Sequence, residues 1–236
     1  MATIGVNLQA VRQRIAEASR ACGRDSGGVG LIAVSKTFGA DAVAAAHACG
    51  LRVFGENYVQ EALEKIAALA GTPGLEWHFI GPIQSNKTRQ IAENFAWVHS
   101  VDRAKIAERL SAARPAALAP LQVCIQINIG GEDTKSGATP ADALALARAV
   151  AALPRLNLRG LMAIPPTSAD PAQQRRYFAE LRELKEQLTA SGIALDTLSM
   201  GMSADLEAAL AEGATLVRVG TAIFGERHQQ QAPGNP

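Results

Sequence analysis

The sequence has few of the features that mark nucleic-acid-binding, secreted or membrane proteins. Its 236 residues carry a formal net charge of +1 and only 4% aromatic residues, which argues against a basic surface that stacks on nucleic-acid bases. The cysteines, Cys22, Cys49 and Cys124, are far apart and not spaced as metal ligands, so they indicate a reducing compartment and no metal site. No stretch resembles a secretory signal or is long enough to span a bilayer. We therefore expect a soluble cytoplasmic protein with neither nucleic acid nor a membrane as a partner.

The pattern that is present is an alternation of short apolar strands with helices, preceded by one additional helix over about residues 4–22. The predicted strands are 31–34, 51–54, 77–80, 95–98, 121–128, 158–164, 195–199 and 215–219. Eight strands in a chain of this length favour a (β/α)8 TIM barrel with an extra N-terminal helix. A doubly wound open sheet is the alternative, although no Gly-x-Gly-x-x-Gly follows the first strand. We expect one domain over residues 1–228 and a disordered polar tail over residues 229–236.

The first predicted strand ends close to a lysine. Lys36 follows the continuous apolar run Leu31–Val34, which is typical of a strand buried on both faces. In parallel α/β proteins the chemistry gathers at the carboxyl ends of the strands. An apolar wall there would remove solvation from the ammonium group and favour the neutral amine, which can attack an aldehyde. Taken alone, the segment is also compatible with a solvated lysine at a strand end.

The loops after the seventh and eighth strands contain glycines and hydroxyl groups. Many barrels bind phosphate at this position through backbone N–H groups. Gly201 and Gly220 permit close approach of the backbone, Met202 lies between Gly201 and Ser203, and the hydroxyls of Ser203 and Thr221 can donate hydrogen bonds. The alternative is that these are ordinary turn glycines and that Ser203 caps a helix over residues 204–212.

Two further polar residues lie near strand ends. Arg218 interrupts an apolar strand, where a charge is costly unless it has a partner, so it forms either a structural ion pair or a bond to a ligand acceptor such as a ring nitrogen. Asn57 could hold a ligand oxygen or cap the next helix. A lysine, a phosphate cradle and a buried arginine at one barrel mouth together suggest pyridoxal 5'-phosphate as an aldimine with Lys36.

Eight motifs then carry a resemblance to a known family. They are AVSKT (33–37), FGENYVQE (54–61), WHFIGPIQSNK (77–87), HSVD (99–102), KSG (135–137), GLM (160–162), LSMGMS (198–203) and VRVGTAIFG (217–225). Together they resemble the pyridoxal phosphate homeostasis proteins, which are similar to the N-terminal barrel of alanine racemase. The resemblance covers nearly the whole chain, from about residue 4 to residue 227.

The resemblance implies an aldimine at Lys36, phosphate contacts after the last two strands, an arginine near the pyridine nitrogen, and Asn57 and Met162 beside the ring. The full predicted set of cofactor-binding residues is Lys36, Asn57, Met162, Gly201, Met202, Ser203, Arg218, Gly220 and Thr221. Many relatives carry a second lysine two residues after the first, where this chain has Phe38. Lys135 matches the other basic position of the family and is a candidate for relaying the cofactor.

Whether the chain is a carrier or a catalyst depends on a second base. An arginine beside the ring nitrogen disfavours its protonation and weakens the ring as an electron sink. Racemisation also needs an acid or base on each face of the substrate carbon. Alanine racemase is implied to take its second base, a tyrosine, from a further domain that we do not expect here. Tyr58 is the nearby candidate, since Tyr177 falls on a long outer helix.

We therefore expect a monomeric, non-catalytic protein that buffers or delivers pyridoxal phosphate, with PLP-dependent apo-enzymes as possible recipients. The first alternative is a PLP-dependent amino-acid racemase that uses Lys36 and Tyr58. The second is a lysine aldolase in the same fold that needs no cofactor.

Overall fold

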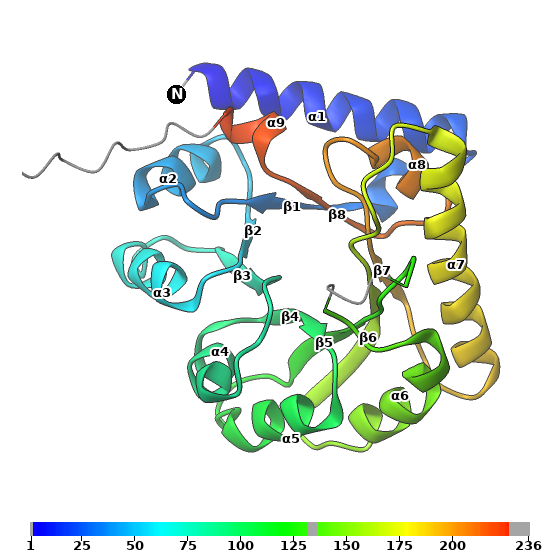
Figure 1. Cartoon of the computed structure of the whole chain (residues 1–236). Helices are drawn as coiled ribbons and strands as arrows, with labels where there is room; N and C mark the ends of the chain where they lie inside the picture. Colours follow the sequence, from blue (N-terminus) through cyan, green and yellow to red (C-terminus); the bar gives the residue numbers. More distant parts are fainter. Residues whose placement is uncertain (1, 132–135, 227–236) are drawn as a thin grey trace, which may run out of the picture.

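The computed structural model describes residues 2–131 and 136–226, and in them eight parallel strands close into a barrel in chain order (Figure 1). The strands are β1 Gly30–Val34, β2 Val53–Glu56, β3 Glu76–Phe79, β4 Trp97–Val101, β5 Leu121–Gln126, β6 Leu156–Met162, β7 Thr197–Ser199 and β8 Leu216–Val219. The ring closes where β1 pairs with β8, in a register that aligns Gly30 with Leu216 and Ala33 with Val219. The predicted TIM barrel is therefore confirmed, and the doubly wound alternative is wrong.

Helices surround the barrel, as Figure 1 shows. They are α1 Ala2–Ala21, α2 Ala40–Ala48, α3 Val59–Ala68, α4 Thr88–Asn94, α5 Ala104–Ala113, α6 Ala143–Ala151, α7 Pro171–Ala190, α8 Leu206–Ala211 and α9 Thr221–Phe224. The predicted extra N-terminal helix is α1, which packs beside α8 and α9. Its side chains reach across, because Asn7 donates a hydrogen bond to the carbonyl oxygen of Ile223 and Arg14 pairs with Glu207.

Three strands, β2, β4 and β7, begin two residues later than predicted, and for β2 and β4 the reason is the same. The apolar residues Leu51 and Phe95 start the predicted strands, but each is buried as part of the connection from the preceding helix. The amide of Leu51 donates to the carbonyl of Ala46 in α2, and the amide of Phe95 donates to the carbonyl of Ile91 in α4. An apolar residue that seals a helix end looks the same in sequence as the first residue of a buried strand.

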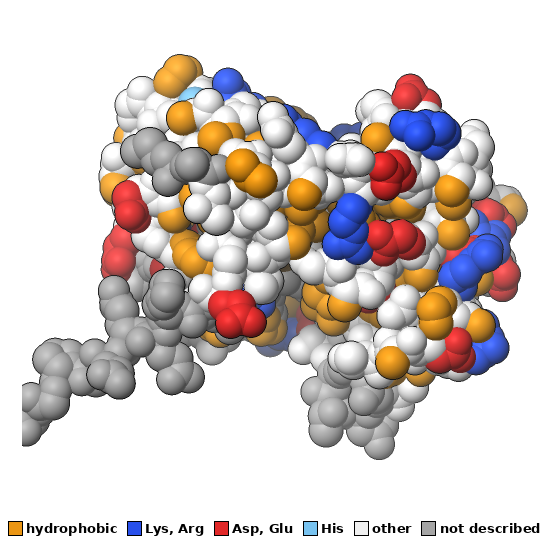
Figure 2. Space-filling view, turned by 90° about the horizontal axis from the view of Figure 1, so that it is seen from above, with side chains coloured by type: hydrophobic (Ala, Val, Ile, Leu, Met, Phe, Trp, Pro, Cys, Tyr) orange, Lys and Arg blue, Asp and Glu red, His pale blue; other side chains and the backbone are white. Residues whose placement is uncertain are grey.

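The surface carries charges of both signs. Viewed from the α1 side, basic and acidic side chains are interspersed, with apolar side chains scattered among them (Figure 2). None of the helices in residues 2–131 and 136–226 is long and apolar enough to cross a membrane. The predicted disordered tail, residues 229–236, lies outside the described residues.

Gly160 is the position in β6 where the barrel tolerates no side chain. It pairs with Cys124 of β5 and Thr197 of β7, and a Cβ at this position would overlap the backbone of Thr197. Backbone atoms in the centre of a closed sheet have little room to move. The β6–β7 contact therefore depends on a glycine here.

We expect Gly160→Ala to lower the free energy of unfolding by about 3 kcal/mol or more, since the overlap forces the two strands apart. Urea titration followed by circular dichroism measures this. Gly71→Ala is the matched control, because a Cβ at Gly71 meets nothing within 4 Å, and it should change stability by less than about 0.5 kcal/mol. Equal stability of the two variants would contradict the expectation.

Candidate functional site

The loops after the strands of the barrel border a cavity of about 300 Å³. Its lining comes mainly from the carboxyl ends of β1, β2, β7 and β8, which is where a TIM barrel places its chemistry. The lining residues are Val34, Lys36, Phe38, Asn57, Ile80, Ile164, Met202, Ser203, Ala204, Arg218, Gly220 and Thr221. Half of these residues are apolar, and the others include a lysine, an arginine, an amide and two hydroxyls.

Most of the predicted site residues come together in this lining, but two do not. Met162 is fully buried in β6, and Gly201 packs against Ala209 with a φ of 94°. Neither lines the cavity. The apolar lining residues Ile80 and Ile164 were not anticipated, because each is the last residue of a predicted strand and cannot be told from core in the sequence.

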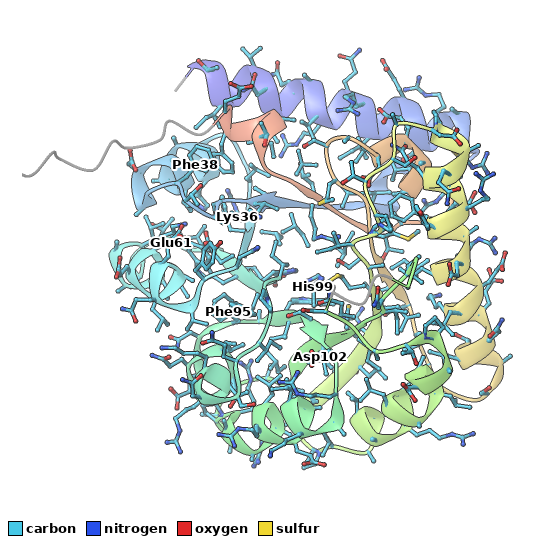
Figure 3. All side chains as sticks on the ribbon, in the orientation of Figure 1. Lys36, Phe38, Glu61, Phe95, His99 and Asp102 are labelled. Carbon is cyan, nitrogen blue, oxygen red and sulfur yellow. The ribbon has the colours of Figure 1, made fainter. Side chains whose placement is uncertain are left out.

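Lys36 lies in a tight turn at the end of β1, where its side chain is half-buried (Figure 3). The amide of Phe38 donates to the carbonyl of Ser35, which closes the turn. Thr37, the third residue of the turn, has a φ of 69°. A β-branched residue rarely adopts this left-handed conformation, and such strain costs about 1–3 kcal/mol. The turn after β1 is therefore strained at Thr37, and contacts with the surrounding structure must hold it in this conformation.

Arg218 is buried and donates three hydrogen bonds to uncharged oxygens. Its Nη1 donates to the carbonyl oxygen of Ser199 at 2.6 Å and to Ser199 Oγ at 2.8 Å, while Nη2 donates to the carbonyl oxygen of Ala163 at 2.8 Å. Burial lowers the pKa of Arg218 to about 10, so the guanidinium remains charged at neutral pH. Within the part of the chain that the structure describes, Arg218 forms no ion pair, so the structural ion pair considered above is not what retains it.

A chain of hydrogen bonds leads from Arg218 through the barrel interior. Ser199 Oγ lies 2.8 Å from His99 Nδ1, His99 Nε2 lies 2.9 Å from His78 Nδ1, and His78 Nε2 lies 2.8 Å from Glu76 Oε1. Because Arg218 can only donate, the Ser199 hydroxyl donates onward to His99. Neutral rings then each carry their proton on Nε2, and His78 donates to Glu76. Every link then has one donor and one acceptor, so the chain keeps the Ser199 hydroxyl available as an acceptor for Arg218.

Both histidines are kept neutral by their surroundings. Complete burial holds the pKa of His99 well below its ordinary value, and the positive charge of Arg218 lowers it further. Burial also lowers the pKa of His78, although its hydrogen bond to Glu76 partly opposes this. A neutral His99 is the form that can accept the Ser199 hydroxyl.

The capping roles considered for two site residues are not observed. Helix α3 follows Tyr58 without a side-chain cap, and Asn57 Oδ1 is buried with no hydrogen-bond partner among the described residues. Helix α8 begins at Leu206 after Asp205, so the predicted cap at Ser203 is wrong. The Asp205 carboxylate instead accepts from the Met202 amide at 2.6 Å. The side chains of Asn57 and Ser203 therefore remain in the cavity lining.

The candidates for a second base, Tyr58 and Tyr177, lie outside the cavity lining, whereas Phe38 is part of it. Tyr58 is 58% exposed and does not line the cavity, while Tyr177 lies on α7. Phe38 stacks on Phe224 with ring centroids 5.0 Å apart, so it closes the cavity against α9. Lys135 lies outside the described residues.

Comparison with known proteins identifies the family. Residues 6–228 match the family model described as alanine racemase, N-terminal domain. A pyridoxal phosphate homeostasis protein of Pseudomonas aeruginosa is 63% identical over 227 residues, covering 96% of this chain and 97% of that one. The chain belongs to the pyridoxal phosphate homeostasis protein family. The member from Escherichia coli is 52% identical over 229 residues, covering 96% of this chain and 98% of that one.

Solved structures of the family have the same fold. PipY of Synechococcus elongatus, solved with PLP bound, is 39% identical with a TM-score of 0.82, and the match covers 94% of this chain and all of PipY. An alanine racemase of Clostridium difficile is 14% identical with a TM-score of 0.73, covering 98% of this chain and 58% of the racemase. At that identity the likeness concerns the barrel alone.

Acidification from pH 8 to pH 5.5 is expected to lower the free energy of unfolding, because the interior histidines are neutral when folded. When the pH falls below about 6.5, the ordinary pKa of histidine in an unfolded chain, the unfolded chain binds protons. His78 and His99 stay unprotonated in the folded protein, because their pKa values are lowered there. The stability is complete above pH 6.5 and is lost as pH falls towards the lowered folded values. The slope of the free energy of unfolding against pH should approach about 1.4 kcal/mol per pH unit for each histidine.

Urea unfolding at several pH values measures this slope, and the chosen window stays above the titration of most carboxylates. His99→Asn removes one of the two groups and should reduce the slope. A wild-type stability that does not change across the window would contradict the assignment of neutral rings.

Proposed function

We propose that this chain binds pyridoxal 5'-phosphate and takes part in intracellular PLP homeostasis, holding and releasing the cofactor without turning over a substrate. The observation that carries the proposal is the convergence of Lys36, Arg218 and two hydroxyls on one cavity. Support comes from PipY, a relative solved with PLP bound, and from curated relatives named as PLP homeostasis proteins.

The residues of the cavity fit the cofactor in their chemistry. The cavity offers a cation for the ring nitrogen of PLP, hydroxyl donors for its phosphate, and apolar side chains for its aromatic face. Asn57 Oδ1, buried and without a partner among the described residues, is suited to a ligand that supplies a hydrogen-bond donor. Bound PLP supplies an aldehyde that can form a reversible covalent link with an amine.

In this proposal Lys36 is the attachment point. Its amine would be the group that forms the reversible covalent link with the aldehyde of the cofactor. The hydroxyls of Ser203 and Thr221 would donate hydrogen bonds to the phosphate. The backbone at Met202 and Gly220 would approach the phosphate closely. Arg218 would hold the pyridine nitrogen and, as a cation, would disfavour its protonation.

The proposal is of a carrier without turnover, since among the described residues the cavity lining offers no carboxylate, histidine or tyrosine as a second acid or base beside Lys36. The exposed position of Tyr58 argues against the racemase alternative. An arginine rather than an acid at the ring nitrogen weakens the electron sink that racemisation needs. We infer a monomeric cytoplasmic carrier whose recipients are PLP-dependent apo-enzymes.

Addition of PLP to the purified protein should produce a visible absorption band with one equivalent bound. Borohydride should convert it to a stable adduct that peptide mapping finds at Lys36, and Lys36→Ala should lose both signals. Lys105→Ala, at an exposed lysine of α5, is the control and should behave as wild type. Adducts spread over several lysines would refute the proposal. Exchange of Cα deuterium in amino acids that Tyr58→Phe abolishes would favour the racemase.

The double variant Ser203→Ala/Thr221→Val should weaken binding of PLP by about tenfold to a hundredfold, since hydrogen bonds to a charged phosphate are lost. Pyridoxal, which lacks the phosphate, should bind the double variant and the wild type equally. Absorbance titration with both aldehydes measures the two effects. A parallel loss for pyridoxal would place these hydroxyls elsewhere in the site.

A further inference from the structure

The turn that carries Lys36 is fastened on both sides by a cluster of charged side chains, Glu56, Glu61 and Lys65. Glu56 ends β2, whereas Glu61 and Lys65 are four residues apart on α3. Figure 3 shows Glu61 on the side of α3 that lies towards Lys36. None of the three lines the cavity, so the cofactor site described above does not use them directly.

Lys65 fastens the residue before Lys36. Its ammonium donates to the carbonyl oxygen of Ser35 at 2.7 Å, to Glu56 Oε1 at 2.7 Å and to Glu61 Oε1 at 2.6 Å. These three bonds match the three donors of an ammonium group. Lys65 is only 4% exposed, so its charge is sequestered here rather than spread on the surface.

Glu56 fastens the side chain of the same serine. The Ser35 hydroxyl donates to Glu56 Oε1, and both residues are completely buried. Burial raises the pKa of Glu56, while the hydrogen bonds from Lys65 and Ser35 oppose that shift. Carbonyl and hydroxyl of Ser35 are thus both committed to this cluster.

Glu61 fastens the residue after Lys36. Its Oε1 accepts a hydrogen bond from the Thr37 amide at 2.6 Å, and Thr37 is the residue held at a φ of 69°. A positive φ at the third residue of a turn normally calls for glycine. Glu61 therefore accepts its hydrogen bond from Thr37, the residue of this turn whose backbone is strained.

We propose that Glu61, supported by Lys65 and Glu56, is a positioning residue that holds Ser35–Thr37 in the strained turn from which Lys36 enters the cavity. The proposal rests on the function assigned to Lys36 above. The positions of the bonds carry it, because the cluster contacts the backbone immediately before and immediately after the lysine and satisfies every donor of Lys65. Without Glu61 the turn relaxes at Thr37, and Lys36 loses its fixed approach to the aldehyde.

The first test uses the protein without cofactor and measures amide hydrogen exchange of residues 35–38. The Thr37 amide should be protected in the wild type although Thr37 is exposed, since Glu61 accepts its hydrogen. Glu61→Ala should increase its exchange rate about tenfold or more, the change expected when a bond to a charged group is lost. Absence of protection in the wild type overturns the proposal without recourse to any variant.

The second test measures PLP affinity and the rate of adduct formation by absorbance. Glu61→Ala should weaken binding about tenfold, and Thr37→Gly in that background should restore most of the loss, because glycine adopts a positive φ without strain. Glu61→Gln keeps an acceptor oxygen and should stay near wild type. Failure of Thr37→Gly to rescue, or a Glu61→Gln variant as weak as Glu61→Ala, overturns the positioning role.

The matched control is Glu186→Gln, which breaks another ion pair of four-residue spacing, Arg182 with Glu186 on α7. It should leave PLP affinity unchanged. If Glu61→Ala lowers only the free energy of unfolding and leaves both exchange at Thr37 and PLP affinity at wild-type values, the cluster is merely structural. If the wild type takes up no PLP at all, the proposed function fails, while hydrogen exchange still decides whether Glu61 holds the turn.

Discussion

The pairing of β1 with β8 is the contact on which the site depends. It joins the first strand of the barrel to the last, and its register sets Ala33 beside Val219. Lys36 and Thr221 then leave neighbouring strands at the same end of the barrel, although 185 positions separate them in the chain. At this join a Cβ on Gly220 would come within 3.1 Å of the carbonyl oxygen of Val34, so the backbones approach more closely than a side chain would permit comfortably. The shape of the cavity follows from this closure.

Arg218 and Lys65 are buried cations, and the protein stabilises them by different means. Arg218 is surrounded by carbonyl and hydroxyl oxygens, and a chain of neutral histidines extends its hydrogen bonding to Glu76 at the far side of the barrel. Lys65 is surrounded by two carboxylates and one carbonyl oxygen. The three donors of the Lys65 ammonium are all used, whereas the three hydrogen bonds of Arg218 use only part of the five N–H donors of its guanidinium. The two arrangements therefore differ in whether a carboxylate balances the buried positive charge.

Much of the fold could be predicted because strands of a parallel barrel are buried on both faces and appear as short apolar runs. The misplaced starts of β2 and β4 arose where Leu51 and Phe95 are apolar for a different reason, the sealing of a helix end. The polar residues of the site could be predicted because burying a polar group next to a buried strand is costly unless the group has a hydrogen-bond partner or a ligand. The apolar lining residues Ile80 and Ile164 carry no such signal, since an apolar residue at a strand end looks like core.

By itself the sequence determined the number and order of the strands, the family, and the polar groups at the strand ends. Only the tertiary structure decided which of those groups share the cavity, because a side chain's direction depends on the local pleat and a shift of one residue turns it to the opposite face. Met162 shows this, as it lies within β6 and remains fully buried. The role of Lys65 was also decided there. On its helix it appears as an ordinary charged residue, and only the packing of α3 against the ends of β1 and β2 brings its ammonium group to Ser35.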